Sequence, residues 1–377
     1  MYFMSSTRLL LPSIITSGIV GYQCLISMPL MVGALVDHRG FTFKTVGIVG
    51  SLELLGMAVA TICISPVIHK MDIARLGLVC AVILAGMQFM SAFQFLPQTF
   101  YLERSITGLA AGIQTGIMAS IIARSTSPER LTALAILGVA FLGGVLNIIM
   151  PHIISQTGVA GGYSSLAVLT LMSLTGYFKF PPRVDGSDKE PSPFRAKFLL
   201  LASFAFIFGL ASSGMWAFTE RMGVAIGMYV TDVGYLLGVG TFFGLIGAGL
   251  AAVLGNKFGS ALPIIIATSI LTLCGLVIPQ VSSVPYFIVL FLIFRFAQNF
   301  NDPFVVGLVA RNDGQGRLIA LNTGFGLLGS AFGPLTAGLI VGNEQNFEKL
   351  GWLYFILTST AFILFFNFIK YIKKLEN

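Results

Sequence analysis

The chain of 377 residues is strongly apolar: 56% of its residues are hydrophobic, 10% are charged and the mean hydropathy is +0.90. Soluble domains carry about 25% charged residues, so this composition excludes a soluble globular protein and indicates an integral membrane protein. The net charge of +7 comes from basic residues scattered through short connecting segments. That distribution argues against a nucleic-acid surface and fits contact with an anionic membrane surface.

Long apolar windows follow one another along the whole chain. A membrane-spanning helix needs about 20 apolar residues, and about twelve such windows are predicted. They cover residues 9–34, 44–68, 75–96, 99–123, 131–153, 161–179, 197–220, 231–254, 260–281, 284–310, 317–341 and 350–372. Barrel strands are much shorter and alternate apolar with polar residues. The expected fold class is therefore an all-α membrane protein with twelve transmembrane helices.

One segment interrupts this succession of apolar windows. Residues 179–197 combine Pro, Ser and charges of both signs and contain no run that could cross a bilayer. We therefore predict an N-terminal six-helix bundle at 1–179, a cytoplasmic linker loop at 180–196 and a C-terminal six-helix bundle at 197–377.

The distribution of basic residues predicts the orientation. If the N terminus is cytoplasmic, the outer loops hold only Arg39, Lys44 and Lys349, and the inner loops hold the other loop Lys and Arg residues. Both termini are then cytoplasmic, in a multi-pass protein of the inner (plasma) membrane. The first apolar run lacks a cleavage site and should be retained.

Metal, disulfide and enzyme chemistry find no support in the sequence. The four cysteines all fall inside predicted spans at unrelated spacings, and the three histidines are far apart. We expect no cofactor, no metal site and no enzymatic activity. The chain also lacks an ATP-binding loop motif, so an ion gradient or the solute's own gradient must drive any transport.

The two halves repeat weakly. Thr45-Val46-Gly47 opens the second window and Asp232-Val233-Gly234 opens the eighth, while Arg104 in the fourth window matches Arg295 in the tenth. The two pairs are separated by nearly the same number of residues. Two related halves with a pathway between them are typical of secondary transporters.

The sequence around Arg104 resembles a known family. Arg104 is followed at fourfold spacing by Gly108 and Gly112 and later by Pro128-Glu129-Arg130, which is similar to the fourth-helix motif of the major facilitator superfamily. The likeness covers the whole chain. It implies two pseudo-symmetric six-helix bundles that rock around a central site in alternating access. The family's inner-loop motif departs here, with His69 and Asn256 in place of its Asp.

Glycines at helical spacing predict close helix contacts. Gly108 and Gly112 should let their helix approach a neighbour. Gly329, Gly333 and Pro334 could bend the window at 317–341 for gating, or could serve plain packing.

Charges inside the windows mark functional candidates, because a buried charge is costly. The proton-coupling candidates are Glu53, Asp302 and Glu220, in that order. Glu53 is a proton carrier, a permanent partner of Arg104 or a hydrogen-bonded structural acid. Glu103 precedes Arg104 and points about 100° away, so it is interpreted as a helix-start residue near the outer surface.

Two further pairs of charged residues each keep two alternative interpretations. Arg295 and Asp302 share one helical face and are either a static pair or contacts for solute or ion. Glu220 and Arg221 could equally be a pair at the membrane rim.

Polar and aromatic residues on the faces of several windows are candidates for a solute cavity. These are Tyr22, Gln23, Ser27, Arg104, Ser213, Trp216, Arg295, Gln298 and Asn299.

The sequence thus predicts a monomeric secondary transporter. Many Phe and Met residues and few charges favour a small amphipathic or aromatic organic solute, with proton coupling and with export ahead of uptake. The alternative is an uptake carrier for an organic anion, with Arg104 and Arg295 as counter-charges. A non-transporting membrane sensor is a third interpretation.

Overall fold

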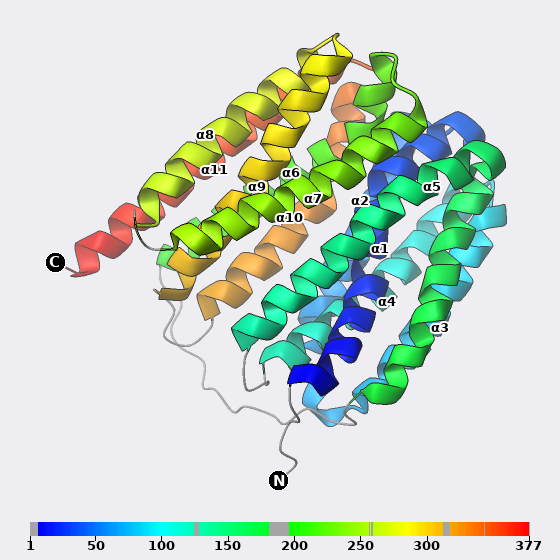
Figure 1. Ribbon diagram of the computed structural model, residues 1–377, viewed down its shortest axis with the longest axis horizontal. Coiled ribbons are helices and arrows are strands. Elements are labelled where there is room, and N and C mark those ends of the chain that lie inside the picture. The colour runs from blue at the N-terminus through cyan, green and yellow to red at the C-terminus, as the bar shows by residue number, and fades with distance from the viewer. Residues whose placement is uncertain are drawn as a thin grey trace. The chain divides into compact units, whose positions relative to one another are not determined.

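The computed structural model describes residues 7–123, 128–180, 196–255, 257, 259–311, 317–342 and 344–376. All regular structure among them is helical (Figure 1). The α-helices are α1 (Thr7–Arg39), α2 (Phe43–Ile64), α3 (Ile73–Phe93), α4 (Pro97–Ala123), α5 (Pro128–Ser173), α6 (Ala196–Ala225), α7 (Val230–Leu254), α8 (Ala261–Val277), α9 (Val284–Arg311), α10 (Arg317–Val341) and α11 (Phe347–Glu376). Three short 3-10 helices are η1 (Ile68–Lys70), η2 (Leu174–Lys179) and η3 (Ile278–Gln280). The predicted linker, apart from its ends, and Asn256 lie outside the described residues.

Apolar length explains these helices. Eleven helices in the described part of the chain are long and apolar enough to cross a membrane. Large apolar side chains point outward on many of them, including Phe93 at 60% exposed and Phe178 at 87% exposed. In a bilayer every backbone polar group must be satisfied within the segment, so continuous helices are the favoured form. The prediction of an all-α membrane protein is confirmed.

Helix α5 accounts for the difference between eleven helices and twelve predicted windows. It has 46 residues and is broken at Gly158, whose φ of 63° and ψ of −150° are not helical. Glycine adopts this region readily, whereas other residues are strained there. Figure 1 shows the α5 ribbon turning back on itself near its middle. Gly158 lies between the predicted windows at 131–153 and 161–179.

The helices gather into two compact units. Unit 1 contains Met1–Phe41 and Leu52–Pro191, and unit 2 contains Thr42–Ser51 and Ser192–Asn377. In unit 1 a buried apolar cluster joins α1, α3, α4 and α5, with Ile14, Leu84 and Ile117 among its members. In unit 2 a second cluster joins α6, α8, α9 and α11 around Leu201 and Phe365.

Glycines set the closest helix approaches in each unit. A Cβ on Gly108 would overlap the backbone carbonyl oxygen of Glu53, so α4 and α2 touch through their backbones. Gly112 repeats this contact one turn later. In unit 2, Gly329 and Gly333 lie in the same way against the backbone of α6. Close packing is therefore present at all four glycines, as expected for small residues at membrane helix contacts.

The start of α3 shows an exposed ion pair. The Asp72 carboxylate accepts a hydrogen bond from the Arg75 backbone N–H at 3.1 Å and caps the helix. The same carboxylate lies 3.2 Å from Arg75 Nε, and the Arg75 side chain is 88% exposed.

Candidate functional site

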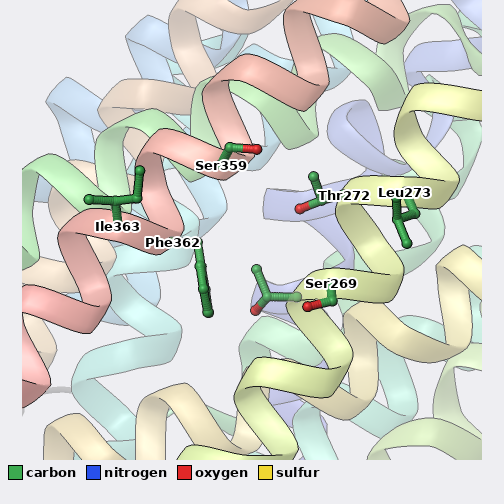
Figure 2. Close-up of a pocket in the computed structure, with 7 residues that line it drawn as sticks. Ser269, Thr272, Leu273, Ser359, Phe362 and Ile363 are labelled. Carbon is green, nitrogen blue, oxygen red and sulfur yellow. The ribbon is translucent and has the colours of Figure 1, made fainter.

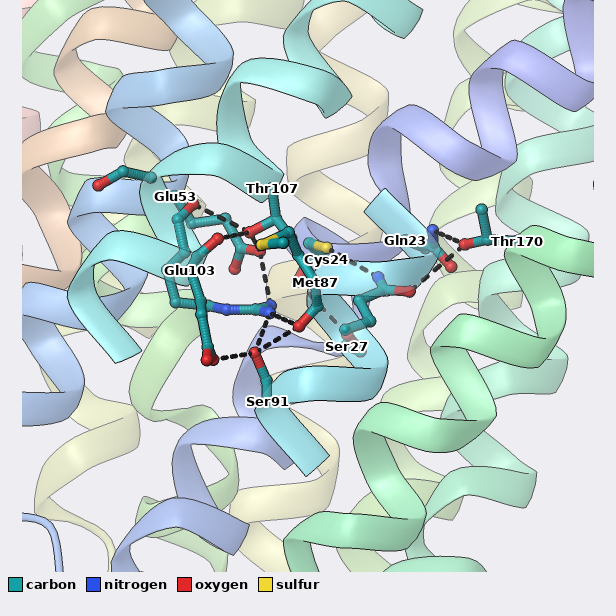
Figure 3. A network of polar contacts seen from close by, with 12 residues as sticks. Gln23, Cys24, Ser27, Glu53, Met87, Ser91, Glu103, Thr107 and Thr170 are labelled. Carbon is teal, nitrogen blue, oxygen red and sulfur yellow. Dashed lines mark hydrogen bonds and ion pairs between the residues drawn. The ribbon is translucent and has the colours of Figure 1, made fainter. Parts of the chain in front are cut away.

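Unit 1 contains a group of buried charged and hydroxyl side chains that we call the Arg104 centre. Its members are Glu53 on α2, Ser91 on α3 and Glu103, Arg104 and Thr107 on α4 (Figure 3). All five are less than nine per cent exposed, and Arg104 is fully buried. The backbone contact at Gly108 places α2 against α4 one turn from Arg104. The glycine that the fourth-helix motif requires thus positions the partner of its arginine.

Arg104 is bound on several sides. Its Nη1 donates to Glu53 Oε1 at 3.1 Å, and its Nη2 donates to Ser91 Oγ at 2.6 Å. The guanidinium carbon also lies 4.5 Å from the centre of the Tyr163 ring, a cation–π contact from α5. The expectation that Glu53 could be the partner of Arg104 is confirmed. This arrangement leaves Arg104 already compensated by an acid.

Glu53 has a second contact within the centre. Thr107 Oγ1 donates to Glu53 Oε1 at 3.1 Å and also lies near the backbone carbonyl oxygens of Glu103 and Arg104. The ion pair is therefore held by hydrogen bonds on the acid as well as on the base. A buried pair needs such additional bonds to offset the loss of hydration.

Glu103, interpreted from the sequence as a helix-start residue near the outer surface, has a buried side chain. Its side chain is 3% exposed, and its Oε2 accepts a hydrogen bond from Ser91 Oγ at 2.6 Å. Ser91 in turn contacts Arg104, so the two α4 residues are linked through α3. The 100° offset between neighbours on α4 excludes a direct contact, but a side chain from another helix bridges them.

A second polar chain crosses unit 1 beside the Arg104 centre. Gln23 Nε2 donates to Thr170 Oγ1 at 2.7 Å, and Gln88 Nε2 lies 3.5 Å from Cys24 Sγ (Figure 3). Gln23 is 1% exposed and its Oε1 has no hydrogen-bond partner. These side chains join α1, α3 and α5.

Two more predicted cavity residues lie on α1. Ser27 is 1% exposed and its hydroxyl donates to the Cys24 carbonyl at 3.4 Å, while Tyr22 is half-buried. Sequence reasoning placed Ser27 with Gln23 on a cavity face, whereas both are enclosed by packing within unit 1.

Unit 2 holds the matching arginine in a different setting. Arg295 is half-buried, its Nη1 donates to Gln298 Oε1 at 2.6 Å and its guanidinium carbon lies 4.9 Å from the Trp216 ring centre. Asn299 Nδ2 donates to the Arg295 backbone carbonyl at 3.1 Å. No ion pair within 4 Å joins Arg295 and Asp302 in the described structure, although their two charges still interact electrostatically. Seven residues separate them by about 10 Å along the helix, which two side chains do not readily close.

Asp302 instead lines a pocket of about 300 Å³ formed by α6, α9 and α10. Phe204 and Phe208 give the pocket aromatic walls. Three of its polar lining atoms are buried without a hydrogen-bond partner in the described structure: Ser212 Oγ, Asn301 Oδ1 and Asn322 Oδ1. Buried polar atoms are normally paired with protein or water, so these three mark a place for a hydrogen-bonding ligand or solvent.

The remaining candidates on α6 are held by other contacts. Glu220 and Arg221 are both buried, and Arg221 Nε lies 2.5 Å from Glu220 Oε2. They form an ion pair that is enclosed by protein, and the alternative of a pair at the membrane rim stays open. Ser213 Oγ donates to the Ser330 carbonyl on α10 at 2.8 Å and serves helix contact.

A second hollow of about 330 Å³ lies between α8 and α11 (Figure 2). Its lining combines Leu273, Phe362 and Ile363 with four hydroxyl side chains and includes no charged residue. We assign it no function.

Sequence reasoning missed Ser91, Thr107 and Tyr163 as partners of Arg104. A serine, a threonine and a tyrosine inside apolar windows carry no signal of their own. Only the fold shows that their helices meet at one arginine.

Comparison with known proteins gives a consistent result. The sequence model described as Major Facilitator Superfamily matches residues 14–334. No curated protein matches the sequence. Two solved structures of the nucleoside transporter NupG, one of them a mutant, align with TM-scores of 0.69 and 0.70 at 14% and 12% identity. Each alignment covers 97% of this chain and 99% of the other, and at this identity it shows a shared fold.

Proposed function

Because this chain belongs to the major facilitator superfamily of transporters, we propose that it moves a small organic solute across the membrane by alternating access, coupled to protons. In this proposal α5 crosses the membrane twice, with its turn at Gly158, which gives twelve crossings in two six-helix bundles. Both termini are cytoplasmic, the membrane is the inner (plasma) membrane, the working form is a monomer and the direction is export.

The observation that carries proton coupling is the buried acid and base content of the Arg104 centre. Two carboxyl groups and one guanidinium lie within it, all at least nine-tenths buried. Ionisable groups inside membrane segments are expensive and mark ion or proton sites in transporters. We place the coupling site here. Asp302 is the second candidate, and Glu220 ranks last because Arg221 already pairs it.

The solute class is supported by unit 2. The pocket at Asp302 combines aromatic walls with unpaired buried oxygen atoms. Its volume is at the lower end of the range for small-molecule sites, about 300 to 1,000 Å³. Such a lining suits an amphipathic or aromatic solute that donates hydrogen bonds. Nucleosides, which the two NupG structures are named for, have this mixed character and belong in a test panel.

One observation favours the second candidate, an uptake carrier for an organic anion. Arg295 is half-buried and has no acidic partner within 4 Å among the described residues. It could therefore serve as a counter-charge for an anion. Arg104 fits that role less well, because Glu53 occupies it.

A binding screen separates the two solute classes. A ligand stabilises the folded protein in proportion to the logarithm of its concentration over Kd. The purified protein is heated with small organic anions, lipophilic cations or nucleosides. Stabilisation by nucleosides or by other uncharged or cationic aromatic compounds supports the first proposal. Stabilisation by anions alone, lost in Arg295→Gln, supports the second.

The coupling proposal is tested in proteoliposomes with a solute from that screen. An imposed pH gradient should drive solute accumulation in the wild type. Glu53→Gln should abolish that response, since it leaves Arg104 without its acid. Glu348→Gln, at an exposed acid at the start of α11, is the matched control and should transport normally. Transport that ignores the gradient, or an unimpaired Glu53→Gln, would remove the proposal.

A further inference from the structure

We propose that Glu103, and not Glu53, is the acid of the Arg104 centre that binds and releases the proton. This inference rests on the proposed proton coupling and names the group that performs it. In this arrangement the Glu53–Arg104 ion pair is fixed and Glu103 is the variable partner.

The first argument is charge balance. Arg104 compensates one carboxylate, and Glu53 takes that place at 3.1 Å with a further hydrogen bond from Thr107. Glu103 is 3% exposed, and in the described structure its carboxyl group makes no hydrogen bond or ion pair with the Arg104 guanidinium. An ionised Glu103 would leave the buried centre with a net negative charge. Burying an uncompensated carboxylate is so costly that such a group normally takes up a proton.

The second argument is hydrogen bonding. Glu103 Oε1 is buried and has no hydrogen-bond partner, whereas Oε2 has one, Ser91 Oγ at 2.6 Å. A carboxylate buried with one oxygen unbonded is poorly stabilised. A neutral carboxylic acid tolerates the same environment better, since its unbonded oxygen is an uncharged carbonyl.

The third argument is the position of Ser91. Its oxygen lies 2.6 Å from Arg104 Nη2, 2.6 Å from Glu103 Oε2 and 2.8 Å from the Met87 backbone carbonyl oxygen. Arg104 is always the donor to Ser91. The serine hydroxyl has one hydrogen, so it donates either to Glu103 or to Met87 but not to both.

These two choices correspond to two protonation states. When Glu103 is ionised, the Ser91 hydroxyl donates to Oε2. When a proton binds at Oε2, Glu103 becomes the donor to Ser91 Oγ, and the serine hydrogen turns to the Met87 carbonyl within α3. In the second state the proton on Glu103 and the hydrogen of Ser91 each have an acceptor, and the net charge of the centre is zero. Proton binding at Glu103 therefore changes the acceptor of the Ser91 hydroxyl hydrogen. The acceptor is Glu103 Oε2 on α4 before the proton binds and the Met87 backbone carbonyl on α3 afterwards.

The other groups around the centre do not supply the missing charge. Cys24 on α1 and Tyr163 on α5 are the further titratable groups that interact with Arg104. A thiol and a phenol are ordinarily neutral at pH 7. Arg39, at the end of α1, is a further cation; it donates to the Ala92 carbonyl at 2.7 Å, packs on Phe95 and forms no ion pair with Glu103 in the described structure.

The experiment reads the proton directly, without a solute. A protonated carboxylic acid has its own infrared carbonyl stretch, which is recorded on the purified protein as the pH is raised. The wild type should show a buried carboxylic-acid band that disappears at high pH. Glu103→Gln should lack this band, and the control Glu348→Gln should retain it. Persistence of every wild-type band in Glu103→Gln would overturn the proposal.

A second variant keeps the test decisive if Glu103→Gln fails to fold. Ser91→Ala removes the hydrogen-bond partner of Oε2, so the same band should shift in frequency. An unshifted band in Ser91→Ala would contradict the assignment to Glu103. An amide at position 103 can donate to Ser91 as the protonated acid does, so Glu103→Gln should fold and mimic the protonated state.

Transport measurements then separate this inference from the proposed function. In proteoliposomes Glu103→Gln should lose gradient-driven accumulation while retaining solute exchange at equal pH. If wild-type transport ignores the pH gradient, the proposed coupling fails. If the wild type responds to the gradient and Glu103→Gln responds equally, coupling stands and the assignment to Glu103 is wrong.

Discussion

Replacing Arg104 by methionine tests whether this residue is the charge that holds unit 1 together at its polar centre. The variant keeps an unbranched side chain of similar reach but removes the guanidinium. Glu53 is then left 8% exposed, with a hydrogen bond from Thr107 and no counter-charge. Breaking a buried ion pair from one side typically costs about 3–5 kcal/mol.

The size of the destabilisation follows from how Glu53 can reduce the cost of losing its counter-charge. Without Arg104, the carboxyl group of Glu53 can lower its cost by binding a proton. Protonating an ordinary glutamate costs about 3.7 kcal/mol at pH 7 and about 1 kcal/mol at pH 5, since each pH unit is worth 1.36 kcal/mol. The folded variant then binds more protons than its unfolded form, so its deficit shrinks as the pH falls.

The assay is thermal unfolding in detergent at both pH values, compared with the wild type. A domain of 150–250 residues loses about 2–4 °C in Tm per kcal/mol, so Arg104→Met should lose about 7 to 15 °C at pH 7 and clearly less at pH 5. Arg75→Met is the matched control, because it removes an 88% exposed arginine that is also paired to an acid. An exposed pair is worth about 0–1 kcal/mol. A deficit equal at both pH values, or no larger than that of Arg75→Met, would refute the reasoning.

Three further predictions concern packing, backbone and topology. Gly108→Ala should sharply reduce the folded yield, because its Cβ would overlap the Glu53 backbone oxygen. The control Gly86→Ala on α3 has open space around the new Cβ and should fold normally. Equal yields of the two variants would contradict the packing account. Gly158→Ala should cost about 1–3 kcal/mol in thermal unfolding, because non-glycine residues are strained at φ 63° and ψ −150°, and an unchanged Tm would argue against that backbone turn. Cys63, the exposed one of four free cysteines, lies near the end of α2, so a membrane-impermeant maleimide should label it from the cytoplasmic side; labelling from outside would reverse the proposed orientation.

The membrane helices could be predicted from sequence because the bilayer fixes their length and composition. The predicted window at 44–68, for example, falls on α2, Phe43–Ile64. The join within α5 could not be placed with the same certainty. Ser155, Gln156 and Thr157 precede Gly158 between the two predicted windows, but only the backbone angles of Gly158 show at which residue the helix breaks.

The Arg104 centre could be predicted from sequence where one buried charge requires a partner of the opposite charge. A buried arginine needs an acid, and Glu53 is the acid in the neighbouring window. The link between Glu103 and Arg104 was missed because helical offset considers one helix at a time, while Ser91 reaches both residues from α3. Arg295 and Asp302 lie on the same face of α9. The length of the side chains also decides which groups are in contact, and Arg295 contacts Gln298 and the Trp216 ring.

Solute-driven proton movement tests the central claim most directly. Proteoliposomes containing the protein and an internal pH-sensitive dye start without any gradient, and a solute that stabilises the protein is then added outside. Coupled transport predicts a change in internal pH that accompanies solute movement in fixed proportion and is absent in Glu103→Gln. Solute movement with no accompanying change in internal pH would contradict proton coupling at the Arg104 centre.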